Sequence, residues 1–164
     1  MNKHIILCKQ YIYMRTRRIQ RGIKKTMSNR NKKSQGNYSD KNIVLMFLQM
    51  LNTVKLYHWK TMSYSQHKAT DELYSELNSN IDKFIEIMLG KDGSRVDLTH
   101  TKSIPLMDYS NISDFASCVE KYKSFLIGMN SNVKLSGTGN SDLMNVRDEI
   151  LGSLNQFTYL LTFK

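Results

Sequence analysis

The chain has 164 residues, of which 40% are hydrophobic and 23% charged, a composition typical of one globular domain. One Pro and eight Gly disfavour a turn-rich all-β fold, and no stretch approaches the roughly 18 consecutive apolar residues of a transmembrane helix. The two cysteines, Cys8 and Cys118, are too few for a disulfide framework. We therefore expect a protein of a reducing compartment without a membrane span.

The formal net charge of +10 comes from the N-terminal part of the chain. Residues 1–40 hold 11 of the 24 Lys and Arg residues and one of the 14 acidic residues, so residues 41–164 hold 13 of each. Residues 15–36 are polar and lack apolar periodicity. This pattern predicts a disordered basic arm over 1–38, followed by a folded domain over 39–164.

The basic arm has the composition of a segment that neutralises DNA phosphates without reading sequence. Its candidate nucleic-acid-binding residues are Arg15, Arg17, Arg18, Arg21, Lys24, Lys25, Arg30, Lys32 and Lys33. Three other interpretations stay open: a solubilising tail, an organelle transit peptide, or a partly untranslated segment if synthesis starts at Met14 or Met27. The apolar run at 5–7 is too short for a secretory signal. We therefore expect a cytoplasmic, nucleoid-associated or virion-associated protein that is not secreted.

Helical periodicity begins near residue 39 and predicts four helices. The expected ranges are about 40–60 after Ser39 as N-cap, 65–89 before Gly90, 113–130 after Ser113, and from Ser141 onward. Residues 90–112 would cross the length of the bundle with a short helical turn near 94–98, and residues 136–140 would form a flexible loop. The pattern indicates an all-α, ferritin-type four-helix bundle with one long crossover.

The predicted core consists of apolar residues, and one threonine, at i, i+3 and i+4 spacing. Its members are Ile43, Phe47, Met50, Leu51, Val54, Tyr57, Thr70, Leu73, Leu77, Ile81, Phe84, Ile85, Met88, Phe115, Val119, Tyr122, Leu126, Met129, Leu143, Val146, Ile150, Leu154, Phe157 and Leu161. Cys118 falls among these positions, so we expect a core thiol without a role in ligand binding.

Four residues of metal-ligand type follow one stripe of the second predicted helix. His67, Asp71, Asp82 and Glu86 fall within roughly a quarter of the helix circumference at about 100° per residue. The rise of the helix separates Asp71 from Asp82 by about 16 Å. One straight helix therefore cannot bring both pairs to the same ion.

Two antiparallel copies of this helix, related by a two-fold axis, remove that difficulty. His67 and Asp71 of one chain would face Glu86 and Asp82 of the other, and His58 would lie near His67 across the short link. Mixed His and carboxylate ligands suit iron or another first-row metal. The alternative is that these residues form only a solvated helix face.

Part of the sequence resembles the Dps family of mini-ferritins, the DNA-binding proteins from starved cells. The resemblance rests on Leu56-Tyr57-His58-Trp59-Lys60-Thr61, on His67-x-x-x-Asp71 and on Asp82-x-x-x-Glu86. Residues 156–161 also look similar to the last helix of Dps-like proteins of large DNA viruses and phages. The resemblance implies a homo-oligomer, from a two-fold dimer to a hollow dodecamer. Such an assembly oxidises iron with peroxide, sequesters the product and binds DNA through a basic arm.

The same resemblance implies a ferroxidase site of two iron ions at the dimer interface. His58, His67 and Asp71 of one subunit would be metal ligands and catalytic residues together with Asp82 and Glu86 of its mate. Trp59 would be a packing or electron-transfer neighbour of this site. The alternative for Trp59 is an ordinary core residue.

The sequence departs from the family pattern in the link between the first two helices. His58 and His67 are nine residues apart, about three fewer than the family shows, and Ile85 and Ile87 stand where the family has Ala and Arg. These differences keep open a second hypothesis, a structural DNA-packaging protein on a ferritin-like scaffold without oxidase activity. A third hypothesis is a helical adaptor that binds only other proteins.

Overall fold

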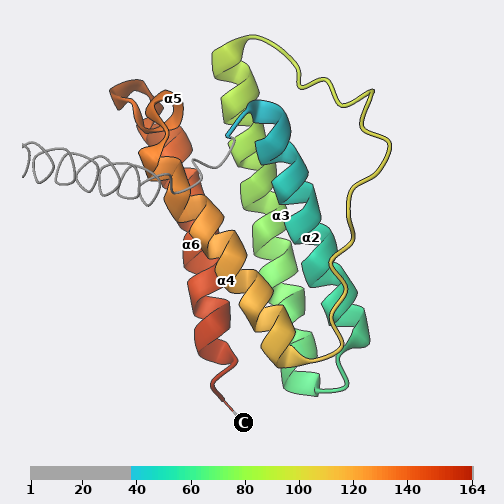
Figure 1. Cartoon of the computed structure of the whole chain (residues 1–164). Coiled ribbons are helices and arrows are strands. Elements are labelled where there is room, and N and C mark those ends of the chain that lie inside the picture. Colours follow the sequence, from blue (N-terminus) through green and yellow to red (C-terminus); the bar gives the residue numbers. More distant parts are fainter. Residues whose placement is uncertain (1–37, 164) are drawn as a thin grey trace, which may run out of the picture. The chain divides into compact units, whose positions relative to one another are not determined.

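The computed structural model of the chain describes residues 38–163, and these residues form helices and loops without a strand (Figure 1). The long helices are α2 (Asp40–Lys60), α3 (Tyr64–Asp92), α4 (Ile112–Gly128) and α6 (Ser141–Leu160). A short helix, α5 (Val133–Ser136), lies between the 3₁₀ turns Met129–Ser131 and Thr138–Asn140. The expectation of an all-α domain is therefore confirmed.

The first two helices, α2 and α3, each begin after a serine whose side chain accepts a hydrogen bond from a backbone N–H of the first turn. Ser39 accepts a hydrogen bond from the Asn42 backbone N–H, which confirms the predicted N-cap, and Ser63 does the same for Gln66 at the start of α3. The expected end of α3 at Gly90 is wrong. The helix continues to Asp92, because the left-handed backbone that ends it belongs to Gly93, with φ +63°.

The crossover between α3 and α4 runs the length of the helices and contacts α2, as the amide of Gln49 donates to the Pro105 carbonyl. The helical turn expected near 94–98 is absent; instead Asp97 accepts two hydrogen bonds from Thr99. The N-cap of α4 is Asn111 rather than Ser113. The loop expected at 136–140 contains a 3₁₀ turn.

α3 lies between two neighbours in the body of the molecule, packing along α2 on one side and α6 on the other, while α4 packs on α6 (Figure 1). Most of the predicted core is buried, including Cys118, whereas Leu51, Ile85 and Leu161 are only partly buried. Aromatic rings connect the helices, since Phe115 stacks on Tyr57 at 4.1 Å between centroids and meets Phe157 edge-on at 5.8 Å.

Buried polar side chains fix the position of α4. The Thr53 hydroxyl donates to the Gln49 carbonyl, so at 2.7 Å it accepts the Tyr122 hydroxyl proton and joins α2 to α4. Arg147 of α6 donates to the Leu126 carbonyl near the end of α4. A buried cation there is favourable because the carbonyl end of a helix carries partial negative charge.

Surface ion pairs hold the end of the body at which α2 begins and α3 ends. The Lys134 ammonium lies 3.2 Å from Asp40 and 3.1 Å from Asp92, and Lys91 lies 2.9 Å from Asp142. We call these five residues the charge clamp. Lys134 is the largest cause that lowers the pKa of Asp92, and Asp92 in turn is the largest cause that raises the pKa of Lys134.

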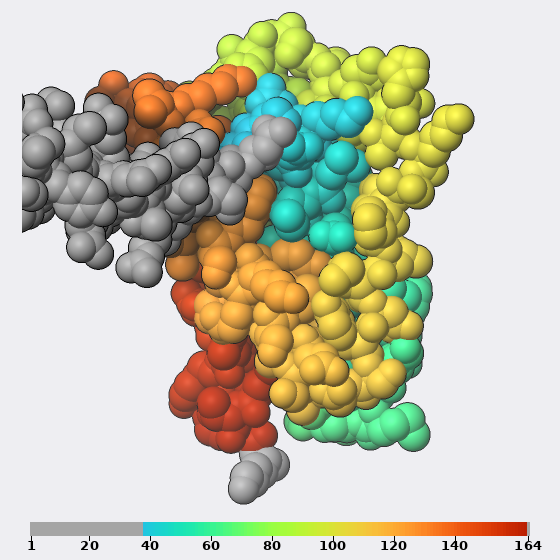
Figure 2. All heavy atoms as spheres, in the orientation of Figure 1, coloured from blue at the N-terminus to red at the C-terminus, as the bar shows by residue number. Residues whose placement is uncertain are grey.

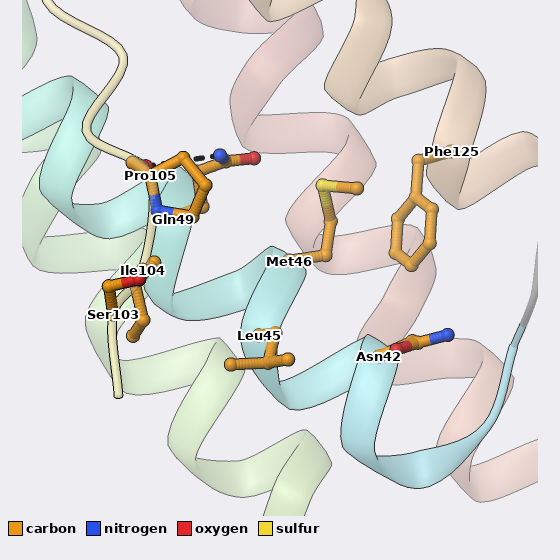
Figure 3. A pocket seen from close by; sticks show the side chains of 8 residues that line it. All are labelled: Asn42, Leu45, Met46, Gln49, Ser103, Ile104, Pro105 and Phe125. Carbon is orange, nitrogen blue, oxygen red and sulfur yellow. Dashed lines mark hydrogen bonds between the residues drawn. The ribbon is translucent and has the colours of Figure 1, made fainter. Parts of the chain in front are cut away.

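A surface hollow on the described residues is seen close up in Figure 3. It measures about 340 Å³ and lies between α2, the crossover and Phe125 of α4. Leu45, Met46, Ile104 and Pro105 make most of its lining apolar. None of the predicted metal ligands lines it. Within 38–163 no helix is long and apolar enough to cross a membrane.

Candidate metal centre

The turn between α2 and α3 brings two predicted ligands into contact. Only Thr61, Met62 and Ser63 separate the helices, so His58 in the last turn of α2 lies beside His67 in the first turn of α3. Their ring centroids are 4.0 Å apart and the ring planes differ by 23°. The expectation that His58 lies near His67 across a short link is confirmed.

Each histidine is fixed by the backbone of the other. His58 Nδ1 lies 3.1 Å from the His67 carbonyl oxygen, and His67 Nδ1 lies 3.1 Å from the His58 carbonyl oxygen. A carbonyl oxygen only accepts, so both Nδ1 atoms carry the proton. In the neutral rings both Nε2 atoms then keep a free lone pair, which is the arrangement that metal-ligating histidines usually show.

Thr70 supports this pair one turn into α3. Its hydroxyl donates to the Gln66 and His67 carbonyls, and His58 Nδ1 lies 3.3 Å from the hydroxyl oxygen. The sequence pattern assigned Thr70 only to the core, and its spacing of three from His67 was the available sign of a second role. Nearby, Tyr57 donates to Gln66, and burial raises the Tyr57 pKa.

Asp71 adds a carboxylate to the pair. Its Oδ1 lies 3.8 Å from His58 Nε2, and the Asp71 side chain is 57% exposed whereas that of His58 is 8% exposed. Two ligand atoms bonded to one ion at about 2.1 Å each stand about 3.0 Å apart at an angle of about 90° and about 3.4 Å apart at a tetrahedral angle. The 3.8 Å gap between these two atoms is somewhat wider, so a shared ion would draw the exposed Asp71 carboxylate slightly toward His58.

The stacking of the two rings bears on whether His58 and His67 can bind the same ion. A metal ion lies close to the plane of the imidazole that binds it, and two rings in nearly parallel planes 4.0 Å apart direct their lone pairs to different points. Without a ring rotation, His58 and His67 would therefore bind different ions. Paired metal sites hold their ions about 3.5–4 Å apart, which is similar to the separation of these rings.

Asp82 and Glu86 lie elsewhere in the chain. Both side chains are exposed, and Asp82 follows Asp71 by 11 residues on the same helix, or about 16 Å. Across residues 38–163, no three His, Cys, Asp or Glu side chains are grouped so that they could hold a metal ion by themselves. One chain therefore places His58 beside His67 and beside Asp71, without gathering the three around one point, and leaves Asp82 and Glu86 apart.

The position of Trp59 contradicts the alternative that it is an ordinary core residue. Its side chain is 69% exposed, so the interpretation of Trp59 as a core residue is wrong. It follows His58 directly and points away from the core with Lys55 over its ring, the Nζ atom 5.8 Å from the ring centroid. The predicted nucleic-acid-binding residues, from Arg15 to Lys33, lie outside the described residues.

Comparison with known proteins places the chain in a family. Residues 58–161 match the Family of unknown function (DUF5856), and the chain belongs to that family. The matched region contains all five predicted ligands and none of the basic residues at 15–33.

The chain is also similar to a phage protein. It is 34% identical over 107 residues to the "Uncharacterized 14.6 kDa protein in mobD-ri intergenic region" of Enterobacteria phage T4. That similarity covers 65% of this chain and 75% of the phage protein. No solved structure matches the chain.

Proposed function

We propose that this protein is a Dps-like mini-ferritin with a ferritin-like four-helix bundle, which oxidises and sequesters iron and binds DNA through its basic arm. The observation that carries the proposal is the crossed pair His58 and His67, whose Nδ1 atoms bond to backbone carbonyls and leave both Nε2 atoms available. A histidine pair that served only to join two helices would not need an adjacent carboxylate facing one of these nitrogens.

A second copy of the chain would complete the site. Antiparallel α3 helices would bring Asp82 and Glu86 of the partner to the histidines of the first chain. Partly buried Tyr74 and Ile85 support such a contact, since they lie within about 60° of Asp71 around α3 and are not fully covered in one chain. Covering apolar side chains of this kind favours association.

The substrate would be Fe(II). Two Fe(II) ions, one molecule of hydrogen peroxide and two protons would give two Fe(III) ions and two water molecules. His58 and His67 would bind one Fe(II) each through neutral Nε2, and the carboxylates of Asp71, Asp82 and Glu86 would favour the harder Fe(III) product. Because both electrons of peroxide reduction come from paired iron, little hydroxyl radical would be released near bound DNA.

The direct test is anaerobic Fe(II) loading followed by peroxide, with iron oxidation measured by absorbance. We expect His67→Ala combined with Asp71→Ala to reduce the oxidation rate to that of a protein-free solution. His100→Ala with Glu72→Ala removes the same kinds of side chain from exposed positions outside the site and should oxidise iron normally. Equal rates for the two double variants would refute the iron site.

A mixing experiment tests whether the site is shared. Asp82→Ala with Glu86→Ala should also be inactive, but dissociating and reassociating it with the His67→Ala, Asp71→Ala protein should restore part of the activity. In a mixed dimer one of the two sites receives all five wild-type ligands. Absence of recovery despite mixed dimers, shown by mass, would contradict the shared site.

The DNA-binding part is tested separately. Deleting residues 1–36 should abolish sequence-independent duplex binding and leave iron oxidation intact, and binding by the full chain should weaken steeply with salt. Arm-dependent DNA binding without any iron oxidation would instead support the structural DNA-packaging alternative.

A further inference from the structure

The turn between α2 and α3 exposes an unusual amount of apolar surface. Trp59 is 69% exposed, Met62 100% and Tyr64 76%, and we call these three residues the aromatic turn. The segment that carries these residues lies at the bottom of the view in Figure 2, coloured blue-green. Tryptophan and methionine are normally well buried, and clustered exposed side chains of this size mark binding surfaces.

Lysines surround the aromatic turn. Lys55 Nζ lies 5.8 Å from the Trp59 ring centroid and 4.6 Å from that of Tyr74, so its charge lies over aromatic rings. Lys68, one turn into α3, is exposed, whereas Lys60 pairs with Asp108 at 2.6 Å. Residues 55–70 contain these three lysines and two histidines but no Asp or Glu.

This combination fits a ligand with flat rings and negative charge. Unpaired bases stack on exposed aromatic side chains, while lysines beside them attract the phosphates. Duplex DNA satisfies only the second condition, because its bases already stack on each other. Asp71 and Glu72 lie at the edge of the turn on α3, so the attraction would come chiefly from the Lys55 and Lys68 side.

We propose that the aromatic turn binds single-stranded DNA, with a base stacked on Trp59 and the adjoining phosphates near Lys55 and Lys68. Tyr64 provides a second stacking surface. The proposal depends neither on the arm nor on iron. It assigns unpaired DNA to the helical body, whereas the proposed function assigns duplex DNA to the arm.

The chain contains a single tryptophan, so its fluorescence reports the aromatic turn alone even in the full-length protein. Titration with an oligothymidylate of about 20 nucleotides, longer than the roughly 4–16 nucleotides that one binding domain covers, should quench this emission strongly. A duplex of the same length should bind to the protein, as shown by anisotropy of a labelled strand, without comparable quenching. Equal quenching by both, or none by the single strand, would overturn the proposal.

Variants locate the contact. Trp59→Ala and Tyr64→Ala should each weaken oligothymidylate binding about fivefold or more, measured by anisotropy of labelled DNA, and leave duplex binding unchanged. Lys68→Ala should weaken single-strand binding less. Ile127→Ala removes a side chain of similar exposure on α4 and serves as the control. All four positions are surface-exposed, so helical content by circular dichroism should not change.

The alternative occupant is another protein chain, and the same signal identifies it. If the aromatic turn instead packs against a second copy, the Trp59 emission should shift to shorter wavelength as protein concentration rises, without DNA. That shift, combined with failure of oligothymidylate to quench, would overturn the assignment. A tenfold lower concentration of oligouridylate for the same quenching would overturn the choice of DNA over RNA.

Discussion

The two ends of the helical body are held together in different ways. At the α2–α3 turn, crossed hydrogen bonds join the buried His58 to the exposed His67. At the opposite end, the charge clamp relies on exposed ammonium and carboxylate groups that neutralise each other. The charged groups of the clamp are paired, whereas the histidine pair holds its helices through Nδ1 alone and keeps Nε2 for another purpose. The histidine pair is therefore a better candidate for a binding site than the clamp, because it has nitrogen atoms that its structural role does not engage.

The largest expected effect on stability comes from the core beneath the turn. Phe115→Ala removes a ring that is fully buried between Tyr57 and Phe157, and should lower the free energy of unfolding by about 3–5 kcal/mol. Urea denaturation measures this loss. Phe163→Ala, at a 59% exposed ring, should change stability by less than about 0.5 kcal/mol. A loss for Phe115→Ala as small as that for Phe163→Ala would mean that the aromatic stack contributes little to stability.

The crossed histidines come next in size. His58→Ala removes a buried ring and its hydrogen bond to the His67 carbonyl, and should cost about 1–3 kcal/mol in urea denaturation. The loss should persist at high salt, because a hydrogen bond from a buried side chain to a backbone carbonyl is screened far less than a surface ion pair. His100→Ala, at an exposed crossover position, should have no measurable effect. A loss that disappears with added salt would contradict this account.

The charge clamp should matter less. Lys134→Ala breaks both ion pairs of an ammonium that is 61% exposed, and should cost no more than about 1 kcal/mol. Added salt should reduce the difference from wild type, in contrast to His58→Ala. A salt-independent loss would show that Lys134 acts through packing of its aliphatic stem rather than through charge.

The pH dependence of the clamp follows from the sign of its pKa shifts. The folded protein lowers the pKa of Asp92, chiefly through Lys134, and that of Asp142, chiefly through Lys91. Both carboxylates therefore stabilise the fold above their unfolded pKa, and this contribution fades as the pH falls through the folded pKa. The raised pKa of Lys134 gives a contribution that is lost only as the pH rises through it, on the alkaline side.

Denaturation of wild type and Lys134→Ala across the acid range measures the effect. The two unfolding curves should converge as the Asp92 carboxylate becomes protonated, and they should differ most at neutral pH. Curves that stay equally far apart in acid would exclude an electrostatic role for the clamp.

The helices and most of the core followed from the sequence because both depend on local information. Ser39 caps α2 as expected, and burial of Phe47, Phe84 and Phe115 follows from apolar spacing. The sequence does not fix the end of α3, because Gly90 and Gly93 are chemically identical, and only the backbone shows that Gly93 adopts positive φ. Leu51 and Ile85 carry the same apolar signal as true core residues, yet they are only partly covered in one chain.

For the candidate metal centre, spacing along α3 grouped His67 with Asp71, and the short link predicted the approach of His58. What spacing could not give was the direction of each ring, since this depends on backbone carbonyls contributed by the opposite helix. The exposure of Trp59 could not be predicted from the sequence either, because an aromatic residue at the end of a helix fits both a core pattern and a surface pattern. Whether Asp82 and Glu86 meet the histidines is a question about two chains, which the sequence of one helix can only suggest.

The hydrogen bond between Tyr122 and Thr53 has a further consequence for how this chain can vary. The Thr53 proton is committed to the Gln49 carbonyl, so the bond runs in one direction only, from α4 to α2. Serine could replace Thr53, whereas valine of the same shape would remove the oxygen that accepts from the buried Tyr122 hydroxyl. The hydrogen bond therefore couples residue choice on two helices that are distant in sequence. As long as Tyr122 stays on α4, we expect position 53 of α2 to keep a hydroxyl, independently of changes at the surface ligands and aromatic rings nearby.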